Sequence, residues 1–327
     1  MHVTSVSNRK TMTIFSDYLP IDFESMREKD FLEKMNESNL TAINNVESGG
    51  GWSKVTTCNL CGNDKHDISL NKNGVNILKC KSCGLVFSSL IPNNFNDVYS
   101  EGYLKRSVEF YESNSDYRKK RFGKERLQIL KKYKSTGTLV DVGCGIGWFL
   151  ELAKNNYNVL GVEYSDELRD YLKTNKNIPS VKELDEINNG SADIITGFDL
   201  IEHVPDPNGF FNLIYQKLKP NGICLLFTPN IDSVGISVQK EKSSLVCPPD
   251  HLYYFSKKTI SEYSEKSCFS VLNIWTKGID IGDIFSMELS QDNNVVAEYL
   301  KKNQHWLQHS IDLAGFGNHM RVLLEKN

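Results

Sequence analysis

The arrangement of apolar and polar residues changes near residue 138. Downstream of it, short apolar stretches such as TLVDV and ADIITGF alternate with segments in which apolar residues recur at helical spacing. Strands that alternate with helices are typical of a parallel sheet with helices packed on both faces. The pattern therefore predicts an α/β domain over residues 135–327.

The chain before this domain has a different pattern. The stretch FESMREKDFLEKMNESNL is charged and weakly amphipathic, and a run of glycines follows it, so residues 1–51 are expected to form an accessory arm that is partly flexible. Residues 93–134 have two helical stretches and are expected to form a helical lid or linker. In the second stretch Phe122, Ile129, Leu130 and Tyr133 share a face, and the opposite face is expected to be basic.

Four of the eight cysteines are regularly spaced. Cys58, Cys61, Cys80 and Cys83 form C-x2-C-x18-C-x2-C, a spacing typical of a four-thiolate zinc site, and a glycine follows each pair. A redox centre would need only one such pair, within a βαβ context. We therefore predict a zinc ribbon over residues 52–92 with a structural Zn²⁺ ion. The remaining cysteines are expected to be small buried or partly buried side chains: Cys144, Cys224, Cys247 and Cys268.

Composition and charge narrow the class of protein. The 327 residues are 39% hydrophobic and 24% charged, as in soluble globular proteins. The formal net charge of −3 does not favour nucleic acid as a partner. No apolar run is long enough for a signal peptide or a membrane span, so the expected location is the cytoplasm. In that reducing compartment cysteines bind metal or remain free rather than forming disulfides.

The segment TLVDVGCGIGWFLELAKNN combines an apolar strand, a glycine-rich turn and an amphipathic helix. Its glycines let the backbone pass close under a ligand at the start of the helix. A dinucleotide fingerprint would need glycine at position 148, where this chain has Trp148. Asp141 suits a ligand with a cationic amino group, and Glu163, after the next strand, can accept both hydroxyls of a ribose.

Taken in order, these segments resemble the class I S-adenosylmethionine-dependent methyltransferases. LVDVGCGIGWFL and VLGVEYS are similar to the first two motifs of that family, ADIITGFDLIEHVPDP to its fourth strand, LKPNGICLLFTPN to its fifth, and GFGNHMRVLLEKN to its final antiparallel strand. The resemblance implies a Rossmann-like, seven-stranded sheet with S-adenosylmethionine as the cofactor. The residues expected to bind this cofactor are Asp141, Gly143, Cys144, Gly145, Gly147, Glu163, Phe198 and Asp199.

A zinc ribbon ahead of such a domain is similar to the sugar C-methyltransferases of deoxysugar pathways and to related enzymes of polysaccharide and natural-product clusters. Those sugar enzymes usually carry a further C-terminal domain, whereas this sequence ends at Asn327. The expected acceptor is a small molecule, a nucleotide-linked sugar or a related metabolite. The basic stretch RKKRFGKERLQILKK either meets a diphosphate or forms a solvated helix face. Residues 290–315 either pair subunits into a homo-oligomer or cap the site.

Methyl transfer requires the protein to align the acceptor and, where the acceptor holds a proton, to remove it. Histidine is the usual base near neutral pH, and two histidines follow strands at the edge where sheet ligands bind. His203 lies in IEHVPDP and His251 in PPDHLYYFS. His203 either acts in catalysis or shapes the start of a helix, and His251 is expected to be a base or an acceptor contact. Tyr99 and Tyr103 either close over the site or pack against the domain.

Other functions remain open at this point. Asp199, Glu202 and His203 form D-x-x-E-H, which is similar to the metal-binding E-x-x-E-H of quinone-pathway O-methyltransferases, so a metal-assisted methylation of a catechol is one alternative. Methylation of RNA or protein, with the ribbon holding the substrate, is another, although the ribbon lacks a dense basic and aromatic surface. A non-catalytic partner protein is the third, and the intact glycine loop argues against it.

Overall fold

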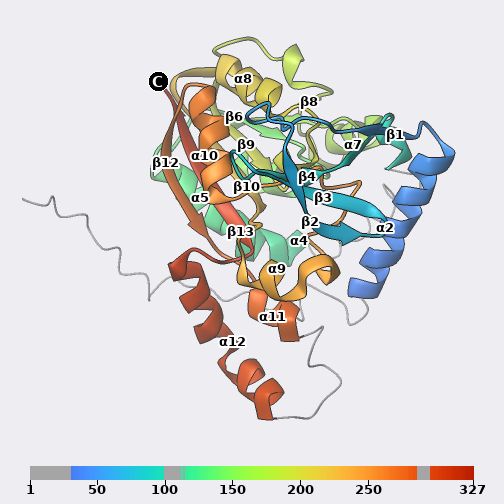
Figure 1. Cartoon of the computed structure of the whole chain (residues 1–327). Coiled ribbons are helices and arrows are strands. Elements are labelled where there is room, and N and C mark those ends of the chain that lie inside the picture. The colour runs from blue at the N-terminus through green and yellow to red at the C-terminus, as the bar shows by residue number, and fades with distance from the viewer. Residues whose placement is uncertain (1–30, 99–111, 113–114, 286–294) are drawn as a thin grey trace, which may run out of the picture.

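The computed structural model of the chain describes residues 31–98, 112, 115–285 and 295–327 (Figure 1). Tyr99 and Tyr103 lie outside the described residues, as does most of the arm expected at residues 1–51. The described part of that arm, residues 31–51, contains helix α2, Phe31–Ser48, which packs Ala42 and Val46 against Trp52 and Val98. The short helix η1, Phe95–Asp97, follows the ribbon.

A seven-stranded sheet forms the centre of the molecule, in the order β12-β13-β10-β9-β6-β7-β8. Its members are β6 Thr138–Val142, β7 Asn158–Val162, β8 Ser180–Val181, β9 Ala192–Phe198, β10 Leu218–Pro229, β12 Phe269–Thr276 and β13 His319–Lys326. Strands β6 to β10 pair in parallel, and β13 runs antiparallel to both β10 and β12. This arrangement confirms the Rossmann-like sheet that the sequence predicted.

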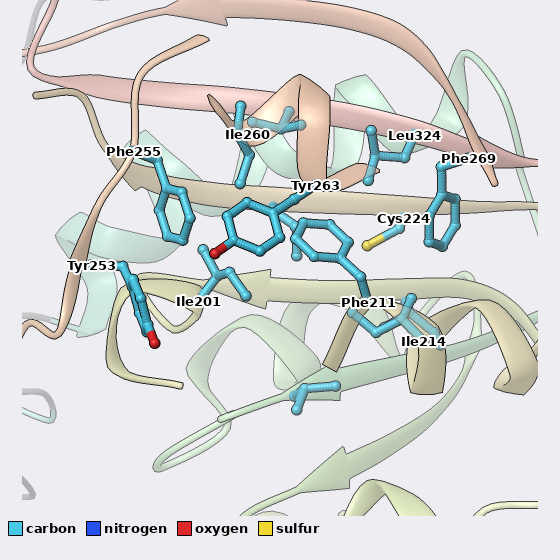
Figure 2. Packing of buried hydrophobic residues seen from close by; sticks show 14 of the residues in the cluster. Ile201, Phe211, Ile214, Cys224, Tyr253, Phe255, Ile260, Tyr263, Phe269 and Leu324 are labelled. Atoms are coloured by element: carbon cyan, nitrogen blue, oxygen red, sulfur yellow. The ribbon is translucent and has the colours of Figure 1, made fainter. Parts of the chain in front are cut away.

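Helices cover both faces of this sheet, because its central strands are apolar on both sides. On one face, Leu139 and Leu225 pack with residues of α5 (Lys124–Lys131), α6 (Trp148–Ala153) and α7 (Asp166–Tyr171). The other face packs against α8 (Pro207–Lys217) and α10 (Lys257–Lys266). Figure 2 shows Phe211 of α8 stacked on Tyr263 of α10, with ring centroids 6.0 Å apart.

The cysteine-rich segment forms two small sheets. Strands β1 (Trp52–Lys54) and β5 (Leu90–Pro92) pair with each other. The second sheet has the order β11-β4-β3-β2, with β2 at His66–Lys72, β3 at Val75–Cys80, β4 at Val86–Ser88 and β11 at Tyr253–Tyr254. Because β11 comes from the sheet domain, the ribbon is joined to that domain by strand pairing. Leu60, Leu85 and Phe87 of the ribbon also share one apolar core with Val140 of the central sheet.

The other helices connect these parts. They are α4 Ser115–Arg118, η2 Lys119–Gly123, η3 Leu172–Lys176, η4 Leu184–Glu186, η5 Ile201–His203, α9 Val234–Gln239, η6 Lys240–Lys242, α11 Asp280–Ile284 and α12 Val295–Ala314. In Figure 1, α12 projects from the body of the molecule. No helix within the described ranges combines the length and apolar content needed to cross a membrane.

Candidate active site

The glycine loop lies between β6 and α6. Gly143, Gly145 and Gly147 all have positive φ angles, of 68°, 54° and 71°. A Cβ atom on Gly147 would lie 2.4 Å from Cδ2 of Leu172, so this glycine allows close packing against the next helical segment. A Cβ atom on Gly145 would meet nothing within 4 Å, so the loop is open at that point and a ligand can approach its backbone.

The structure brings Glu163 to this loop. Its Oε2 accepts a hydrogen bond from the backbone N–H of Gly145 at 2.9 Å, and its Oε1 accepts one from that of Ser165 at 3.0 Å. Burial raises the pKa of Glu163, and these backbone donors oppose that effect. Each carboxylate oxygen keeps a second lone pair, so the side chain is held in place and can still accept hydrogen bonds from a ligand.

Asp141 lies beneath the loop and is only 3% exposed. Its Oδ1 accepts a hydrogen bond of 2.6 Å from the Thr196 hydroxyl on the neighbouring strand β9. Burial raises the pKa of Asp141 to about 7. Its expected contact with a cationic amino group stays a prediction. Cys144, also expected to bind the cofactor, is buried within the apolar cluster under the same loop.

Arg126, which the sequence interpretation did not single out, lies among residues expected to bind the cofactor. Its guanidinium lies over the Phe198 ring, 3.6 Å from the centroid, and also faces Trp148 at 4.6 Å and Phe227 at 5.0 Å. Burial lowers the pKa of Arg126 to about 10, opposed by the charges of Asp199 and Asp141. Helix α5 therefore places a cation beside two residues expected to bind the cofactor, Phe198 and Asp199.

The expected faces of this helical segment are wrong at two positions. Arg121, expected on the basic face, is only 6% exposed, and Tyr133, expected on the apolar face, is 46% exposed. Arg126 is 5% exposed. A signal for the burial of Arg126 was present, since it lies four residues from both Phe122 and Leu130 and so shares their face. Cys268, expected to be buried or partly buried, is also exposed.

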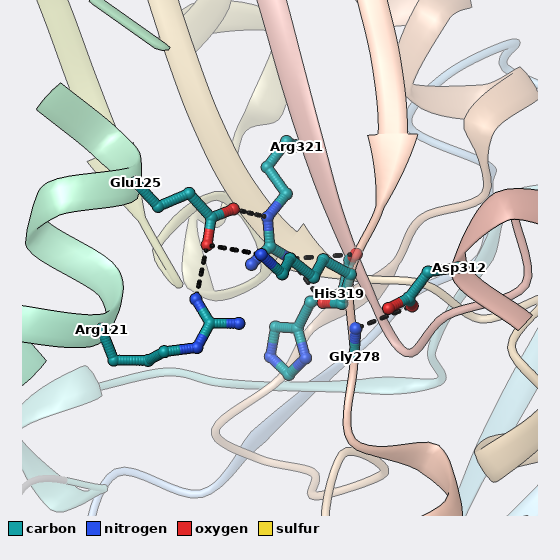
Figure 3. A network of polar contacts seen from close by, with 7 residues as sticks. Arg121, Glu125, Gly278, Asp312, His319 and Arg321 are labelled. Atoms are coloured by element: carbon teal, nitrogen blue, oxygen red, sulfur yellow. Dashed lines mark hydrogen bonds and ion pairs between the residues drawn. The ribbon is translucent and has the colours of Figure 1, made fainter. Parts of the chain in front are cut away.

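Helix α5 is tied to the central sheet by a buried ion cluster (Figure 3). Glu125 accepts from Arg121 and from Arg321 of β13, each at 3.0 Å, and its Oε2 lies 3.6 Å from the Nζ of Lys277. Burial alone would raise the pKa of Glu125, but the charges of Arg321, Lys277 and Arg121 outweigh it and lower that pKa to about 2. The cluster fixes the helix that carries Arg126.

His203 and His251 lie together at the carboxyl edge of the sheet. Their ring centroids are 4.7 Å apart and the rings meet edge to face. The Nδ1 atom of His203 lies 2.8 Å from the carbonyl oxygen of Asp250 and 3.1 Å from its carboxylate. The Nδ1 atom of His251 lies 2.9 Å from the carbonyl oxygen of Leu245. The structure thus brings together two histidines that the sequence separates by a long excursion.

The two imidazoles are in opposite electrostatic environments. Burial opposes protonation of His203, but the carboxylate of Asp250 outweighs it and raises the pKa of His203 to about 10. Burial and the neighbouring charge of His203 lower the pKa of His251 to about 4. At neutral pH the pair therefore consists of one imidazolium and one neutral imidazole.

Glu202 also faces this pair. Burial raises its pKa to about 7, and its Oε2 accepts a hydrogen bond of 2.9 Å from the Thr228 hydroxyl. The possible ligand atoms of Glu202, His203 and His251 lie within 4.8 Å of one another. Asp199, the first member of the D-x-x-E-H pattern, is not in this group and lies 3.6 Å from the Nε2 atom of His319.

The four regularly spaced cysteines converge in the ribbon. Their sulfur atoms all lie within 4.8 Å of one another, with Cys58 3.5 Å from Cys83 and Cys61 3.5 Å from Cys80. Zinc–sulfur bonds of about 2.3 Å in a tetrahedron require sulfur atoms about 3.8 Å apart. The cluster is therefore compatible with a tetrahedral zinc site in an N-terminal ribbon.

The fold of the sheet and the glycine loop together define a class of protein. A seven-stranded sheet with a reversed strand β13, a glycine loop after β6 and an acid after β7 are the features of a class I, S-adenosylmethionine-dependent methyltransferase. Residues 115–273 match the family described as Methyltransferase domain, which confirms the resemblance seen in the sequence.

Curated relatives match a shorter region. The ubiquinone biosynthesis O-methyltransferase of Hydrogenovibrio crunogenus is 30% identical over 117 residues, covering 32% of this chain and 48% of that protein. The protein of the same name from Psychrobacter cryohalolentis is 32% identical over 106 residues, covering 28% and 40%. The chain thus spans about half the length, or less, of these relatives.

Solved structures show similarity over a larger part of the chain. A possible histamine N-methyltransferase from Thermotoga maritima has a TM-score of 0.48 at 18% identity, covering 68% of this chain and 98% of that one. An S-adenosylmethionine-dependent methyltransferase from Archaeoglobus fulgidus has a TM-score of 0.45 at 17% identity, covering 64% and 98%.

Proposed function

We infer that the chain transfers the methyl group of S-adenosylmethionine to a small-molecule acceptor, a nucleotide-linked sugar or a related metabolite. The observation that carries this proposal is the pair of histidines with opposite pKa shifts, His203 and His251, at the edge of the sheet that also bears the glycine loop. His251 is neutral at neutral pH and can accept a proton; the charge of His203 makes it a weaker base but would stabilise an anion that forms on the acceptor.

The cofactor supplies an activated methyl group when it is bound. Glu163 would accept hydrogen bonds from its ribose, since its carboxylate is already oriented by the Gly145 and Ser165 amides. Phe198 and Asp199 would lie near its amino-acid part, and Arg126 offers a cation for its carboxylate at the same place. The open backbone of the glycine loop would form the floor beneath it.

His251 would act as the general base. With its Nδ1–H donating to the carbonyl oxygen of Leu245, a neutral His251 keeps the lone pair of Nε2 for a proton from the acceptor. His203, protonated and paired with Asp250, would orient this group and hold a positive charge beside it. The four cysteines would hold Zn²⁺ as a structural ion.

The test begins with the variant His251→Ala. We expect unchanged affinity for S-adenosylmethionine by titration calorimetry, and a fall in turnover of about a hundredfold or more with nucleotide-linked sugars as acceptors. Exposed His305 on α12 provides the matched control, His305→Ala. An unchanged rate in His251→Ala would remove this residue from the mechanism.

A second measurement needs no acceptor. The pKa of His251 is held low partly by the charge of His203, so His203→Gln should raise it from about 4 toward the ordinary value of 6.5. NMR titration of the imidazole signals measures this directly. A base must be neutral, so the acid limb of the rate profile should also move to higher pH. An unmoved titration would contradict the proposed coupling of the two rings.

One alternative has an observation of its own. Because the ligand atoms of Glu202, His203 and His251 lie within 4.8 Å of one another, the same site suits a divalent cation that assists O-methylation of a catechol-type acceptor. The named activity of the curated relatives is an O-methylation. Metal analysis separates the two proposals: a second bound ion that is lost in Glu202→Gln but kept in Cys80→Ser would favour the metal-assisted reaction.

A further inference from the structure

A cleft of about 810 Å³ lies between the ribbon and the segment that follows β10. One wall comes from β2, β3 and the second cysteine pair, and the other from α9, the residues before it and the start of α10. Neither the glycine loop nor the histidine pair lines this cleft. The cleft therefore shares no lining residue with the glycine loop or the histidine pair.

The floor of the cleft is apolar. Val86 and Ile236 line it and are buried in a small core with Tyr254, and the half-buried Leu70 and Ile231 pack against the same core. An apolar floor favours a ligand with a flat or apolar body. The hydroxyls of Ser69, Ser82, Ser237 and Ser256 line the walls and add hydrogen-bonding groups.

The rim of the cleft is positively charged. Four lysines and two aspartates line it: Lys79, Lys81, Lys240, Lys258, Asp67 and Asp232. Of the two aspartates, Asp67 forms an ion pair with Lys81, with Oδ1 and Nζ 2.7 Å apart. Lys79 belongs to the ribbon and Lys240 to η6, and both side chains are exposed. The lysines exceed the aspartates by two, and a Zn²⁺ ion held by four thiolates would add a charge of about −2 at Cys80 and Cys83 in the same lining, so the positive charge is local to the lysines.

Packed residues separate the cleft from the proposed acceptor side of the site. Ile231 and Asp232 come two and three residues after the carboxyl end of β10. Tyr254, which belongs to the core beneath the floor, also faces His251, with ring centroids 6.1 Å apart. Tyr254 therefore lies between the floor of the cleft and the histidine pair, so about one side chain separates the two sites.

The basic helical segment, expected either to meet a diphosphate or to form a solvated helix face, has three of its cations engaged elsewhere. Arg121 binds Glu125 in the buried ion cluster, Lys119 pairs with Glu151 at 2.7 Å, and Arg126 lies over the ring of Phe198. Lys79, Lys240 and Lys258 line the cleft instead.

We propose that this cleft binds the nucleoside diphosphate part of the acceptor, with the base on the apolar floor and the phosphates between Lys79 and Lys240. The proposal rests on the function inferred above. It gives the ribbon a direct part in recognising the acceptor, because one of the two phosphate-binding lysines belongs to β3.

Uridine diphosphate is the probe for the test, added to the full chain without any methyl transfer. Calorimetry should detect its binding, weakened by added salt, and uridine without phosphate should bind at least about tenfold more weakly. The double variant Lys79→Glu, Lys240→Glu should lose about tenfold or more in affinity for uridine diphosphate. It should keep the affinity of the native chain for S-adenosylmethionine.

Lys173→Glu, an exposed lysine of η3 remote in sequence from the cleft residues, is the matched control and should bind both ligands as the native chain does. Absent binding of uridine diphosphate, equal binding of uridine, or full retention in the double variant would each overturn the proposal. Failure of the proposed function would instead appear as absent binding of S-adenosylmethionine, which the same titrations measure separately.

Discussion

Replacing Glu125 by glutamine tests whether the buried ion cluster holds helix α5 in place. Its pKa is lowered from 4.5 to about 2, and at about 1.36 kcal/mol per pH unit this difference corresponds to about 3 kcal/mol of stability. The side chain is 14% exposed, so solvent screening reduces this value little. Glu125→Gln also leaves Arg321, Arg121 and Lys277 without their shared carboxylate.

The sign of the pH dependence follows from the direction of the shift. A lowered carboxyl pKa stabilises the native state above pH 4.5, and this contribution is lost as the pH falls toward about 2. Urea denaturation should therefore show a loss of about 3 kcal/mol in Glu125→Gln at pH 7, and about 2 kcal/mol at pH 3.5. Because α5 carries Arg126, affinity for S-adenosylmethionine should fall as well.

Glu37→Gln on the exposed side of α2 is the matched control, and its stability should change by less than about 0.5 kcal/mol. If Glu125→Gln behaved like this control at pH 7, the cluster would not be holding the helix. An equal loss at pH 7 and pH 3.5 would refute the electrostatic reasoning, because a packing defect does not follow the titration of a carboxyl group.

Three further predictions follow from the glycine loop and the ribbon. Glu163→Ala should weaken binding of S-adenosylmethionine by about tenfold or more in calorimetry, since a carboxylate acceptor is lost; unchanged affinity would undo the ribose assignment. Gly147→Ala should cost about 1–3 kcal/mol in thermal denaturation, because its φ is positive and its Cβ would collide with Leu172. Chelation of metal, or Cys80→Ser, should increase hydrogen exchange across the ribbon and at residues 245–256 without abolishing cofactor binding. If the folded ribbon and cofactor binding were lost together, the ribbon and the methyltransferase domain would be more tightly coupled than this.

The sheet and the cofactor side could be predicted because their signals are local. Strand and helix periodicity, the glycines of the loop and the acid after the next strand are all encoded within about 25 residues of one another. The cysteine spacing likewise specified the cluster in the ribbon. Each of these features depends on residues whose neighbours in space are also near them in sequence.

The acceptor side of the site depends on contacts between segments that are distant in sequence, so less of its geometry could be predicted from the sequence. The pairing of His203 with Asp250 joins the end of β9 to a long excursion after β10, and β11 is only two residues long, too short for any periodicity to show. Arg126 was not singled out from the sequence, although it lies four residues from apolar neighbours on either side. Both the histidine–aspartate pairing and the burial of Arg126 arise from packing between segments that are distant in sequence.

The pairing of β11 with β4 gives the ribbon its place in the molecule. Tyr253 pairs with Phe87 and Tyr254 with Val86, and the Ser88 amide donates to the carbonyl oxygen of Leu252, directly after His251. On its other side, the Leu252 amide donates to the carbonyl oxygen of Glu202. The backbone that carries the proposed base is therefore held between the ribbon and the end of β9, whereas Glu163 is held by the glycine loop and Ser165. A change in the structure of the ribbon should consequently displace His251 more than it displaces the cofactor loop.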